Sequence, residues 1–386
     1  MERRRTKPRP DWQQKVESHG LSFHSTEAGP YWDESAYYAF TESEVAVLEQ
    51  ATYALDGLCL QAVEHLLTER PDLLVERFLI PEPFVDLCRR SWDRDEVTVY
   101  GRFDLSFDGR NPPKMLEYNA DTPTSLLESA VVQWFWMKEC HPRLDQFNSL
   151  HERLIEAWKR WAAESGVGKE AVSFLSVSTS DEDAQTTAYM RDVATQAGLR
   201  CVQGDVSELG WNAPQRRFVD AREYPVRACF KLYPWEWMIR EPFAAHLGES
   251  FDDTLWLEPM WKMVLSNKAI LPVLWDLFPG HENLLPAAFE RLGWDCVRKP
   301  VFGREGKGVT VLAADDPEPP YVPYVPYDRF AGPPVYQQLC PLPSFDGNRP
   351  VVGSWMVNGN ACGVGIREDR SPVTGNTSRF VPHVIV

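Results

Sequence analysis

The sequence predicts a mixed fold, with both α+β and α/β character, in more than one structural unit. Three features indicate this fold: a helical pattern over residues 41–67, a hairpin pattern over 98–119, and a strand–helix–strand order after residue 171. The chain has 386 residues, which at about 150 residues per domain corresponds to two or three units. Its 44% hydrophobic and 12% aromatic residues supply the side chains that buried cores need.

The charge and the apolar pattern exclude several classes of protein. The 40 Lys and Arg against 56 Asp and Glu give a net charge of −16, whereas proteins that track nucleic-acid phosphates carry a basic surface. The longest apolar run, Ala130–Met137, falls far short of the ~20 residues that a membrane helix needs. We therefore expect neither a nucleic-acid partner nor a membrane span.

The N-terminal residues and the cysteines bear on the compartment. No apolar stretch follows the basic residues 1–10, so an export signal is not expected. The eight cysteines lie more than twenty positions apart, without a C-x-x-C pair, which argues against a zinc site. A chain of this length builds its own core without a disulfide framework. We expect reduced, mostly buried thiols in a cytoplasmic protein.

The elements before residue 165 include the predicted hairpin. Residues 41–67 are expected to form one helix, with a hydroxyl side chain available to cap its start. Residues 98–107 and 114–119 alternate between polar and apolar side chains, and the turn-rich segment between them predicts a hairpin. Two helices are expected to follow, one after Ser125 and one over about 147–163.

The middle of the chain has a β-α-β pattern. Residues 172–177 and 201–206 are strand candidates, and residues 181–198 between them are a helix candidate. This order predicts parallel strands in a small α/β unit. We therefore expect three regions, at 1–165, 166–260 and 261–386.

The third region carries two lysines and two unusual loops. Lys268 is expected to lie at the end of a helix, and Lys299 at the end of a strand. The loop 303–308 has glycines that would let its N–H groups cradle phosphate, although an ordinary hairpin turn is the simpler interpretation. The Pro-rich segment 317–334 predicts a flexible insertion. Residues 335–339 predict a strand, either a plain core strand or one whose backbone faces an adenine.

The predicted hairpin carries the sharpest signal for chemistry. With the turn at 108–113, strand pairing sets Asp104 opposite Glu117. The same register sets Arg102 opposite Asn119, on the same face. Two carboxylates about 4 Å apart repel by roughly 4 kcal/mol, so a proton, a salt bridge or a cation must offset them. Oxygen ligands of this kind suit Mg²⁺ with nucleotide phosphates, and a ladder of surface salt bridges is the alternative.

Several other chemistries have no sequence signal. The eight histidines are isolated, and neither H-E-x-x-H nor G-x-S-x-G occurs. A nucleophilic hydrolase is therefore not indicated. The chain also lacks the Walker A pattern, so any phosphate site must be built in another way.

Five segments together resemble a known family. They are Arg102–Asp104, Glu117–Ser125, Lys231–Glu236, Ser266–Lys268 and Lys299–Gly306, and they follow one another in family order. The chain resembles the synthetase domain of glutathionylspermidine synthase over residues 10–386, and most closely the stand-alone bacterial relatives provisionally named acid–amine ligases. The amidase domain that precedes the synthetase in the bifunctional enzyme has no counterpart in these segments, so hydrolase activity is not carried over.

The resemblance implies an ATP-grasp fold, in which ATP lies between two antiparallel sheets, with a small α/β substrate-binding unit beside it. It also implies a carbon–nitrogen ligase that joins a carboxylic acid to an amine through an acyl phosphate and releases ADP and phosphate. By motif match, Mg²⁺ would be held by Asp104, Glu117 and Asn119. ATP would be contacted by Arg102, Phe103, Asp104, Lys268, Lys299, Glu305, Gly306, Gln337, Gln338 and Leu339.

The resemblance also suggests residues for the reacting groups. Arg102 would stabilise the phosphoryl group in transfer, and Arg304 and Arg367 would contact the phosphoryl group or the acid. Thr122 and Thr124 stand where the family has small hydroxyl residues that contact the acid substrate. Two further substrate candidates are Glu182 and Tyr233.

Three functions remain open at this stage. The first is the ligase, with a glutathione-like or peptide acid and an unidentified amine. The second is a small-molecule kinase that stops at phosphoryl transfer, and the third is a nucleotide-binding protein that has lost catalysis. The sequence does not indicate an oligomeric state.

Overall fold

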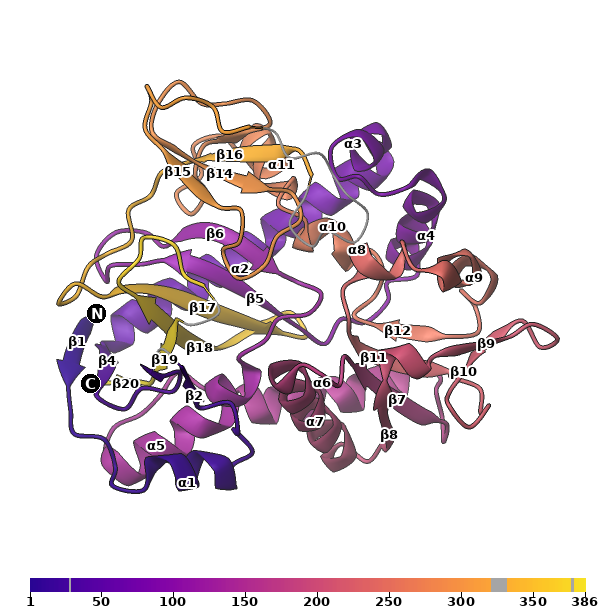
Figure 1. Ribbon diagram of the computed structural model, residues 1–386, viewed down its shortest axis with the longest axis horizontal. Helices are drawn as coiled ribbons and strands as arrows, with labels where there is room; N and C mark the ends of the chain where they lie inside the picture. Colours follow the sequence, from indigo (N-terminus) through magenta and orange to yellow (C-terminus); the bar gives the residue numbers. More distant parts are fainter. Residues whose placement is uncertain (28, 321–331, 376–377) are drawn as a thin grey trace.

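The protein is described here by a computed structural model, which covers residues 1–27, 29–320, 332–375 and 378–386 (Figure 1). Its centre is a five-stranded antiparallel sheet in the order β19-β18-β17-β5-β6. These strands are β5 (Tyr100–Ser106), β6 (Lys114–Asn119), β17 (Arg349–Val357), β18 (Asn360–Asp369) and β19 (Arg379–Val381). The predicted hairpin β5–β6 therefore shares one sheet with strands that follow it by more than two hundred residues.

Helices cover both faces of this sheet. On one face lies α2 (Glu42–Thr68), where the Thr52 hydroxyl bonds the Ser354 hydroxyl of β17 at 2.6 Å. On the other face a π-helical turn, η1 (Glu128–Val132), contacts β18, and the Trp355 indole donates to Ser129 of this turn at 3.0 Å. The polar face of the hairpin is the one that α2 does not cover.

A second antiparallel sheet has the strand order β13-β16-β14-β15. Its strands are β13 (Ala287–Ala288), β14 (Cys296–Pro300), β15 (Thr310–Leu312) and β16 (Pro334–Gln338). The apolar helix α11 (Ile270–Leu277) packs against β13 and β16, and α10 (Lys262–Ser266) precedes it. Figure 1 shows this sheet at the top of the view, above β6.

A third sheet is parallel and has the order β12-β11-β7-β8. Its strands are β7 (Ala171–Ser176), β8 (Arg200–Asp205), β11 (Ala228–Leu232) and β12 (Leu255–Leu257). The helix α7 (Asp181–Gln196) joins β7 to β8 and packs against both strands. The helix α6 (Leu150–Glu164) packs in turn against α7. The predicted β-α-β unit with parallel strands is confirmed.

The two ends of the chain meet in a small sheet of β1 (Glu2–Arg5), β4 (Ala36–Phe40) and β20 (His383–Ile385). The remaining helices are α1 (Trp12–Ser18), α3 (Pro71–Glu76), α4 (Glu82–Asp93), α5 (Gln133–Cys140), α8 (Trp235–Met238), α9 (Ala245–Glu249), η2 (Val206–Glu208) and η3 (Pro242–Ala244). The remaining strands are β2 (Ser25–Thr26), β3 (Gly29–Pro30), β9 (Gly210–Asn212) and β10 (Arg217–Val219).

The long N-terminal helix forms for the reason that the sequence suggests. Thr41 caps α2 by accepting from the N–H of Glu44, and the Glu44 carboxylate accepts from the N–H of Thr41 at 2.8 Å. This capping box satisfies two of the free N–H groups at the start of the helix. One face of α2, with Leu48, Leu55 and Leu66 fully buried, packs into the larger core.

Two local predictions were wrong. Lys268 does not lie on a helix, because α10 ends at Ser266 and the extended backbone of Asn267 breaks the pattern. The Ser266 hydroxyl accepts from the N–H of Asp121 at 2.8 Å, which ties this end of the helix to the end of β6. The register of the hairpin also changes near its turn, because Leu105 pairs with Met115 rather than with Leu116.

The Pro-rich segment 317–334 falls mostly outside the described residues. The domain boundaries near residues 165 and 260 stay a prediction. Among the described helices, none has the length and apolar character needed to cross a bilayer.

Candidate active site

Two adjoining cavities lie on the polar side of the hairpin. The larger has a volume of about 650 Å³, the smaller about 100 Å³, and both are lined by Glu117, Gly306 and Thr374. Most sequence-predicted residues line the larger one: Arg102, Glu117, Asn119, Thr122, Thr124, Glu182, Arg304, Glu305, Gly306 and Arg367. The smaller one is lined by Asp104, Lys268, Lys299, Gln337, Gln338 and Leu339.

One end of the hairpin face is a closed network of charges. Arg102 donates from Nε to Oδ1 of Asp104 at 2.7 Å and from Nη1 to the carbonyl of Thr124 at 2.6 Å. Arg367, on β18, donates to the other Asp104 oxygen at 2.6 Å. The two guanidiniums hold the carboxylate between them, and Arg102 and Asp104 are both buried. This pairing offsets the cost of burying the charges.

A glycine on the neighbouring strand leaves the space that the Arg102 side chain occupies. Gly353 of β17 pairs with Asp104 across the sheet, and a Cβ there would lie 2.8 Å from Cδ of Arg102. Real Cβ atoms do not approach other carbons that closely, so any side chain at this position would displace the guanidinium. This requirement has no signal in the sequence, because it depends on a strand that lies far away along the chain.

Glu117 is more open than Asp104. Its side chain is 29% exposed, against 3% for Asp104, and it pairs with Lys268 at 3.0 Å. Desolvation would raise the pKa of Glu117, but the charges of Lys268 and Lys299 outweigh it and hold the pKa well below its usual range. Asn119 donates weakly to Glu117, at 3.4 Å. Glu117 is therefore an ionised carboxylate with access to both cavities.

A bulge in the hairpin positions the second lysine. Because the register shifts between Asp104 and Leu105, Leu116 is the extra residue of β6, and its carbonyl accepts from Nζ of Lys299 at 2.8 Å. Nζ of Lys299 also donates to the Gln337 side chain at 2.7 Å. Burial lowers the pKa of Lys299 to about 8, although Glu117 opposes the shift. A nearby anion would strengthen the charged form of this lysine.

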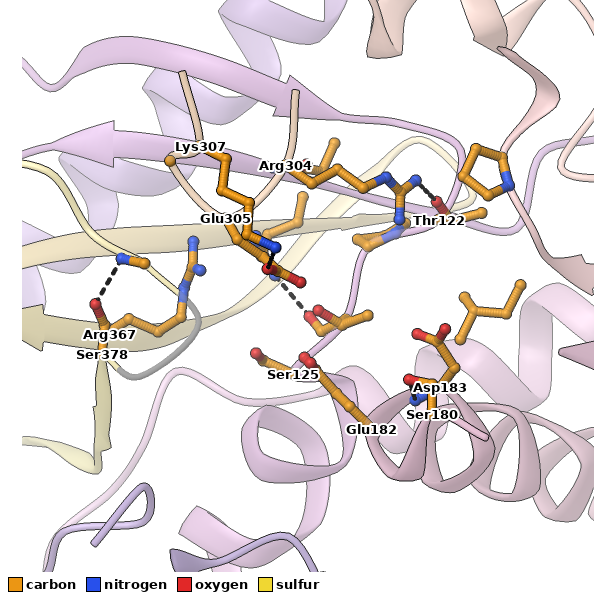
Figure 2. Close-up of a pocket in the computed structure, with 18 of the residues that line it drawn as sticks. Thr122, Ser125, Ser180, Glu182, Asp183, Arg304, Glu305, Lys307, Arg367 and Ser378 are labelled. Atoms are coloured by element: carbon orange, nitrogen blue, oxygen red, sulfur yellow. Dashed lines mark hydrogen bonds and ion pairs between the residues drawn. The ribbon is translucent and has the colours of Figure 1, made fainter. Parts of the chain in front are cut away.

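The loop 303–308 reaches over the boundary between the two cavities. Gly306 has φ +67°, and a Cβ on it would meet the Thr374 carbonyl and lie 2.8 Å from Cγ1 of Val373. Only glycine fits here, both for the backbone conformation and for the space. From this loop Arg304 donates to the Thr122 hydroxyl, and Lys307 pairs with Glu305 at 3.1 Å, as Figure 2 shows.

The opposite wall of the larger cavity is acidic. Ser180 caps α7, and the residues that follow, Asp181, Glu182 and Asp183, line the cavity. Burial, followed by the charge of Glu182, raises the pKa of Asp183 to about 6, although Arg304 opposes the shift. Figure 2 shows Glu182 and Asp183 across the cavity from Arg304 and Lys307. The cavity therefore has a cationic side and an anionic side.

Two predicted residues lie away from the cavities. The ring of Phe103 stacks on Tyr118 with centroids 3.8 Å apart, on the other face of the hairpin from Arg102. The Tyr233 hydroxyl donates to Glu241 at 2.6 Å, and Tyr233 does not line either cavity. Their assignments to ATP and to substrate stay predictions.

Other residues at the site were missed by the sequence reasoning. Tyr31 and Ser125 line the larger cavity, and Glu128 lies behind them. Asp121 forms a fully buried ion pair with Lys231 at 2.7 Å and accepts from the N–H of Trp235 at 2.8 Å. Asp121 and Ser125 lie in the segment Glu117–Ser125, which was identified from the sequence. The spacing of its residues does not indicate which side chains are buried in ion pairs and which line a cavity.

The donor set of the hairpin face fits a hard cation. Asp104 and Glu117 offer carboxylate oxygens, Asn119 offers an amide oxygen, and Glu117 remains ionised. Among the described residues no group of three His, Cys, Asp or Glu side chains could hold a metal by itself. A cation here would therefore need ligands from water or phosphate as well, as Mg²⁺ usually does.

The comparison with known proteins decides the family. The family described as glutathionylspermidine synthase preATP-grasp matches residues 3–386. The chain belongs to this family. A Haemophilus influenzae protein provisionally named an acid–amine ligase is 39% identical, over 98% of this chain and 98% of its own. The predicted resemblance and the predicted enzyme class, a carbon–nitrogen ligase, are confirmed.

More distant relatives have longer chains. A trypanothione synthetase of Crithidia fasciculata is 31% identical over 78% of this chain, and a bifunctional glutathionylspermidine synthetase/amidase of Escherichia coli is 30% identical over 91%. The matches span 50% and 59% of these two proteins, respectively. The structure of a glutathione synthetase-like effector from Globodera pallida covers 97% of this chain and 95% of its own with a TM-score of 0.59 at 12% identity. The mixed α/β fold with several sheets is thus of the glutathione synthetase-like type.

Proposed function

We propose that the protein is an ATP- and Mg²⁺-dependent ligase that forms an amide between a carboxylic acid and an amine and releases ADP and phosphate. The observation that carries this proposal is that a small cavity with two lysines meets a large polar cavity at Glu117. A nucleotide in the small cavity would direct its terminal phosphate toward an acid in the large one. The names of the relatives, which are ligases and synthetases, support the same reaction class.

The lining of the smaller cavity suits a nucleotide, although its volume of about 100 Å³ holds only part of one. It lies between β6, of the five-stranded antiparallel sheet, and β14 and β16, of the four-stranded one, which is the arrangement expected of an ATP-grasp fold. Lys268 and Lys299 would hold the phosphates, and Gln337, Gln338 and Leu339 would border the adenine. Phe103 would contribute only through its backbone, because its ring faces away.

The larger cavity fits the acid and the amine. Arg102 and Arg367 would stabilise the phosphoryl group as its charge moves, because both are already aligned by Asp104. Arg304 would hold the acid together with the hydroxyls of Thr122 and Thr124. Mg²⁺ at Asp104, Glu117 and Asn119 would neutralise the phosphate oxygens. Glu305 and Gly306, in the loop above, would exclude water from the acyl phosphate.

The acidic wall fits a cationic amine. Glu182 and its neighbours lie opposite the cationic side of the cavity. An ammonium group would be attracted to the acidic wall, and an acid to the cationic side. Tyr233 lies farther from the cavities and would act on substrate only through neighbouring residues. The acid is proposed to be glutathione-like or a peptide.

The test is ADP release by the full chain, in a screen over acid and amine pairs that includes glutathione with polyamines and amino acids. ADP release that needs both substrates supports the ligase. Release with the acid alone and no conjugate would indicate a kinase. No release with any pair, together with calorimetry that detects no uptake of ATP and Mg²⁺, would contradict the proposal.

A further inference from the structure

A buried carboxylic acid stands behind the larger cavity, and among the described residues it forms no ion pair. Glu128 is 4% exposed and accepts a hydrogen bond from the Tyr31 hydroxyl at 2.7 Å. The same hydroxyl lies 3.2 Å from the Ser125 hydroxyl. Tyr31 and Ser125 both line the cavity, although each is less than 5% exposed. The three side chains form one hydrogen-bonded row from the cavity wall to Glu128.

The backbone around this row is unusual at two places. Ser125 has φ +64°, a conformation that costs energy for a residue with a Cβ. Glu128 begins the π-helical turn η1, and such turns are rare and frequent at functional sites. The two ends of the hydrogen-bonded row, Ser125 and Glu128, therefore both lie at unusual places of the backbone.

The charge of Glu128 is set by its surroundings. Burial raises its pKa to about 7, and the carboxylate of Glu182 on α7 adds to the shift. The hydrogen bond from Tyr31 and the guanidinium of Arg102 on β5 act in the opposite direction. Near neutral pH both the ionised and the protonated forms are populated, which is the range in which a group exchanges protons most effectively.

The reaction proposed above needs a group that takes a proton. An amine substrate enters largely as the ammonium ion, whose nitrogen has no free electron pair for attack on the acyl phosphate. Glu182 and Asp183 attract such an ion to the wall that also carries Ser125 (Figure 2). One proton must leave the nitrogen before the carbon–nitrogen bond can form.

We propose that Ser125, Tyr31 and Glu128 form a proton relay that deprotonates the ammonium ion of the amine substrate. The ammonium gives a proton to Oγ of Ser125, the Ser125 proton passes to the Tyr31 oxygen, and the Tyr31 proton passes to the ionised Glu128. The freed amine then attacks the carbonyl carbon, the carbon–oxygen bond to phosphate breaks, and the second nitrogen proton leaves on the phosphate. Glu128 returns its proton to solvent after product release. This relay rests on the proposed ligase function.

The experiment compares two nucleophiles in the presence of ATP, Mg²⁺ and glutathione. Spermidine is protonated near neutral pH and needs the relay, whereas hydroxylamine is mostly neutral and does not. We expect the ratio of the spermidine product to the hydroxamate to fall about a hundredfold in Glu128→Gln, a size typical of general-base catalysis. Tyr31→Phe and Ser125→Ala are expected to act in the same direction. The exposed Glu152→Gln on α6 is the matched control.

The outcomes separate the relay from the ligase function. A ratio that stays within about twofold of wild type in Glu128→Gln overturns the relay, whether or not total activity falls, since general bases contribute far more than that. If this ratio falls in Asp183→Asn but not in the three relay variants, Asp183 accepts the proton, and the relay is likewise overturned. If wild type forms neither product and releases no ADP, the proposed function fails for this acid.

A second measurement does not depend on turnover. Infrared difference spectra of the full chain between acid and alkaline pH report the carbonyl band of a protonated carboxyl group. We expect a band that titrates with a midpoint near the Glu128 value, about 7, and that Glu128→Gln removes. A spectrum in which Glu128→Gln removes no such band shows that Glu128 does not titrate in this pH range, and the relay would then be wrong.

Discussion

The two carboxylates that face each other across the hairpin differ in how their charge is balanced. Asp104 is 3% exposed and is held by the guanidiniums of Arg102 and Arg367, whereas Glu117 is 29% exposed and pairs with Lys268. A buried carboxylate bound on both sides has little freedom to move. A partly exposed one exchanges partners at small cost. We infer from this difference that Asp104 also orients the two arginines, and that Glu117 is the one of the two proposed metal ligands that would change partner when nucleotide and metal bind.

The largest effect is expected at Asp104. Asp104→Ala leaves the buried Arg102 without its carboxylate, and breaking one partner of a buried pair costs about 3–5 kcal/mol of unfolding free energy. Urea unfolding measures this loss. The control is Glu164→Ala, which breaks the exposed Arg160–Glu164 pair on α6 and is expected to cost no more than about 0.5 kcal/mol. Equal losses in the two variants would show that the buried network does not carry stability.

The third carboxylate of the site, Glu128, sharpens the comparison because it forms no ion pair within the part of the chain that the structure describes. Its pKa is about 7 in the folded protein, above the ordinary value of 4.5. Between these two values the folded state holds a proton that the unfolded state has lost, so this contribution to stability falls as pH rises from about 4.5 to about 7. The full shift corresponds to roughly 3–4 kcal/mol as an upper limit.

Glu128→Gln should remove this pH dependence. Urea unfolding of wild type and variant at several pH values gives the difference, in which the titration of all other groups cancels. We expect wild type to lose stability relative to the variant as pH rises toward 7. A difference that does not change with pH would mean that Glu128 has an ordinary pKa in the folded protein.

A smaller effect is expected at the loop that borders both carboxylates. Gly306→Ala puts a side chain at φ +67° and against Thr374, and the conformation alone costs about 1–2 kcal/mol. The loop should shift away from residues 373–375, and the KM for ATP should rise in the steady-state assay. Gly293→Ala is the control, since nothing lies within 4 Å of a Cβ there. A change of KM that is the same in both variants would contradict the role of this loop.

A smaller loss of stability than at Asp104 is expected at Glu117. Glu117→Gln removes a partly exposed carboxylate rather than a fully buried one, so the unfolding free energy should fall by less than in Asp104→Ala. Calorimetry with ATP and Mg²⁺ should nevertheless show much weaker binding, because a carboxylate ligand is lost. A large loss of stability with unchanged binding would reverse the roles given to Asp104 and Glu117.

Part of the site could be predicted from the sequence because strand geometry is local. The side chains of a strand alternate, so the positions of Arg102, Asp104, Glu117 and Asn119 followed from the turn between the two strands. The pairs Asp104–Glu117 and Arg102–Asn119 were predicted correctly, although the bulge at Leu116 was not. The bulge was not predicted, because the hydrogen bond from Lys299 that accompanies it comes from a different sheet.

The amino-acid sequence by itself determined the helix capped at Thr41, the parallel β-α-β unit and the polar face of the hairpin, because each depends on residues within about thirty positions of one another along the chain. Only the tertiary structure decided which cations reach that face and which glycines make room for them. Arg367 and Gly353 reach Asp104 from strands that follow it by about 250 residues along the chain. Such contacts depend on how whole sheets pack, and no local periodicity encodes them.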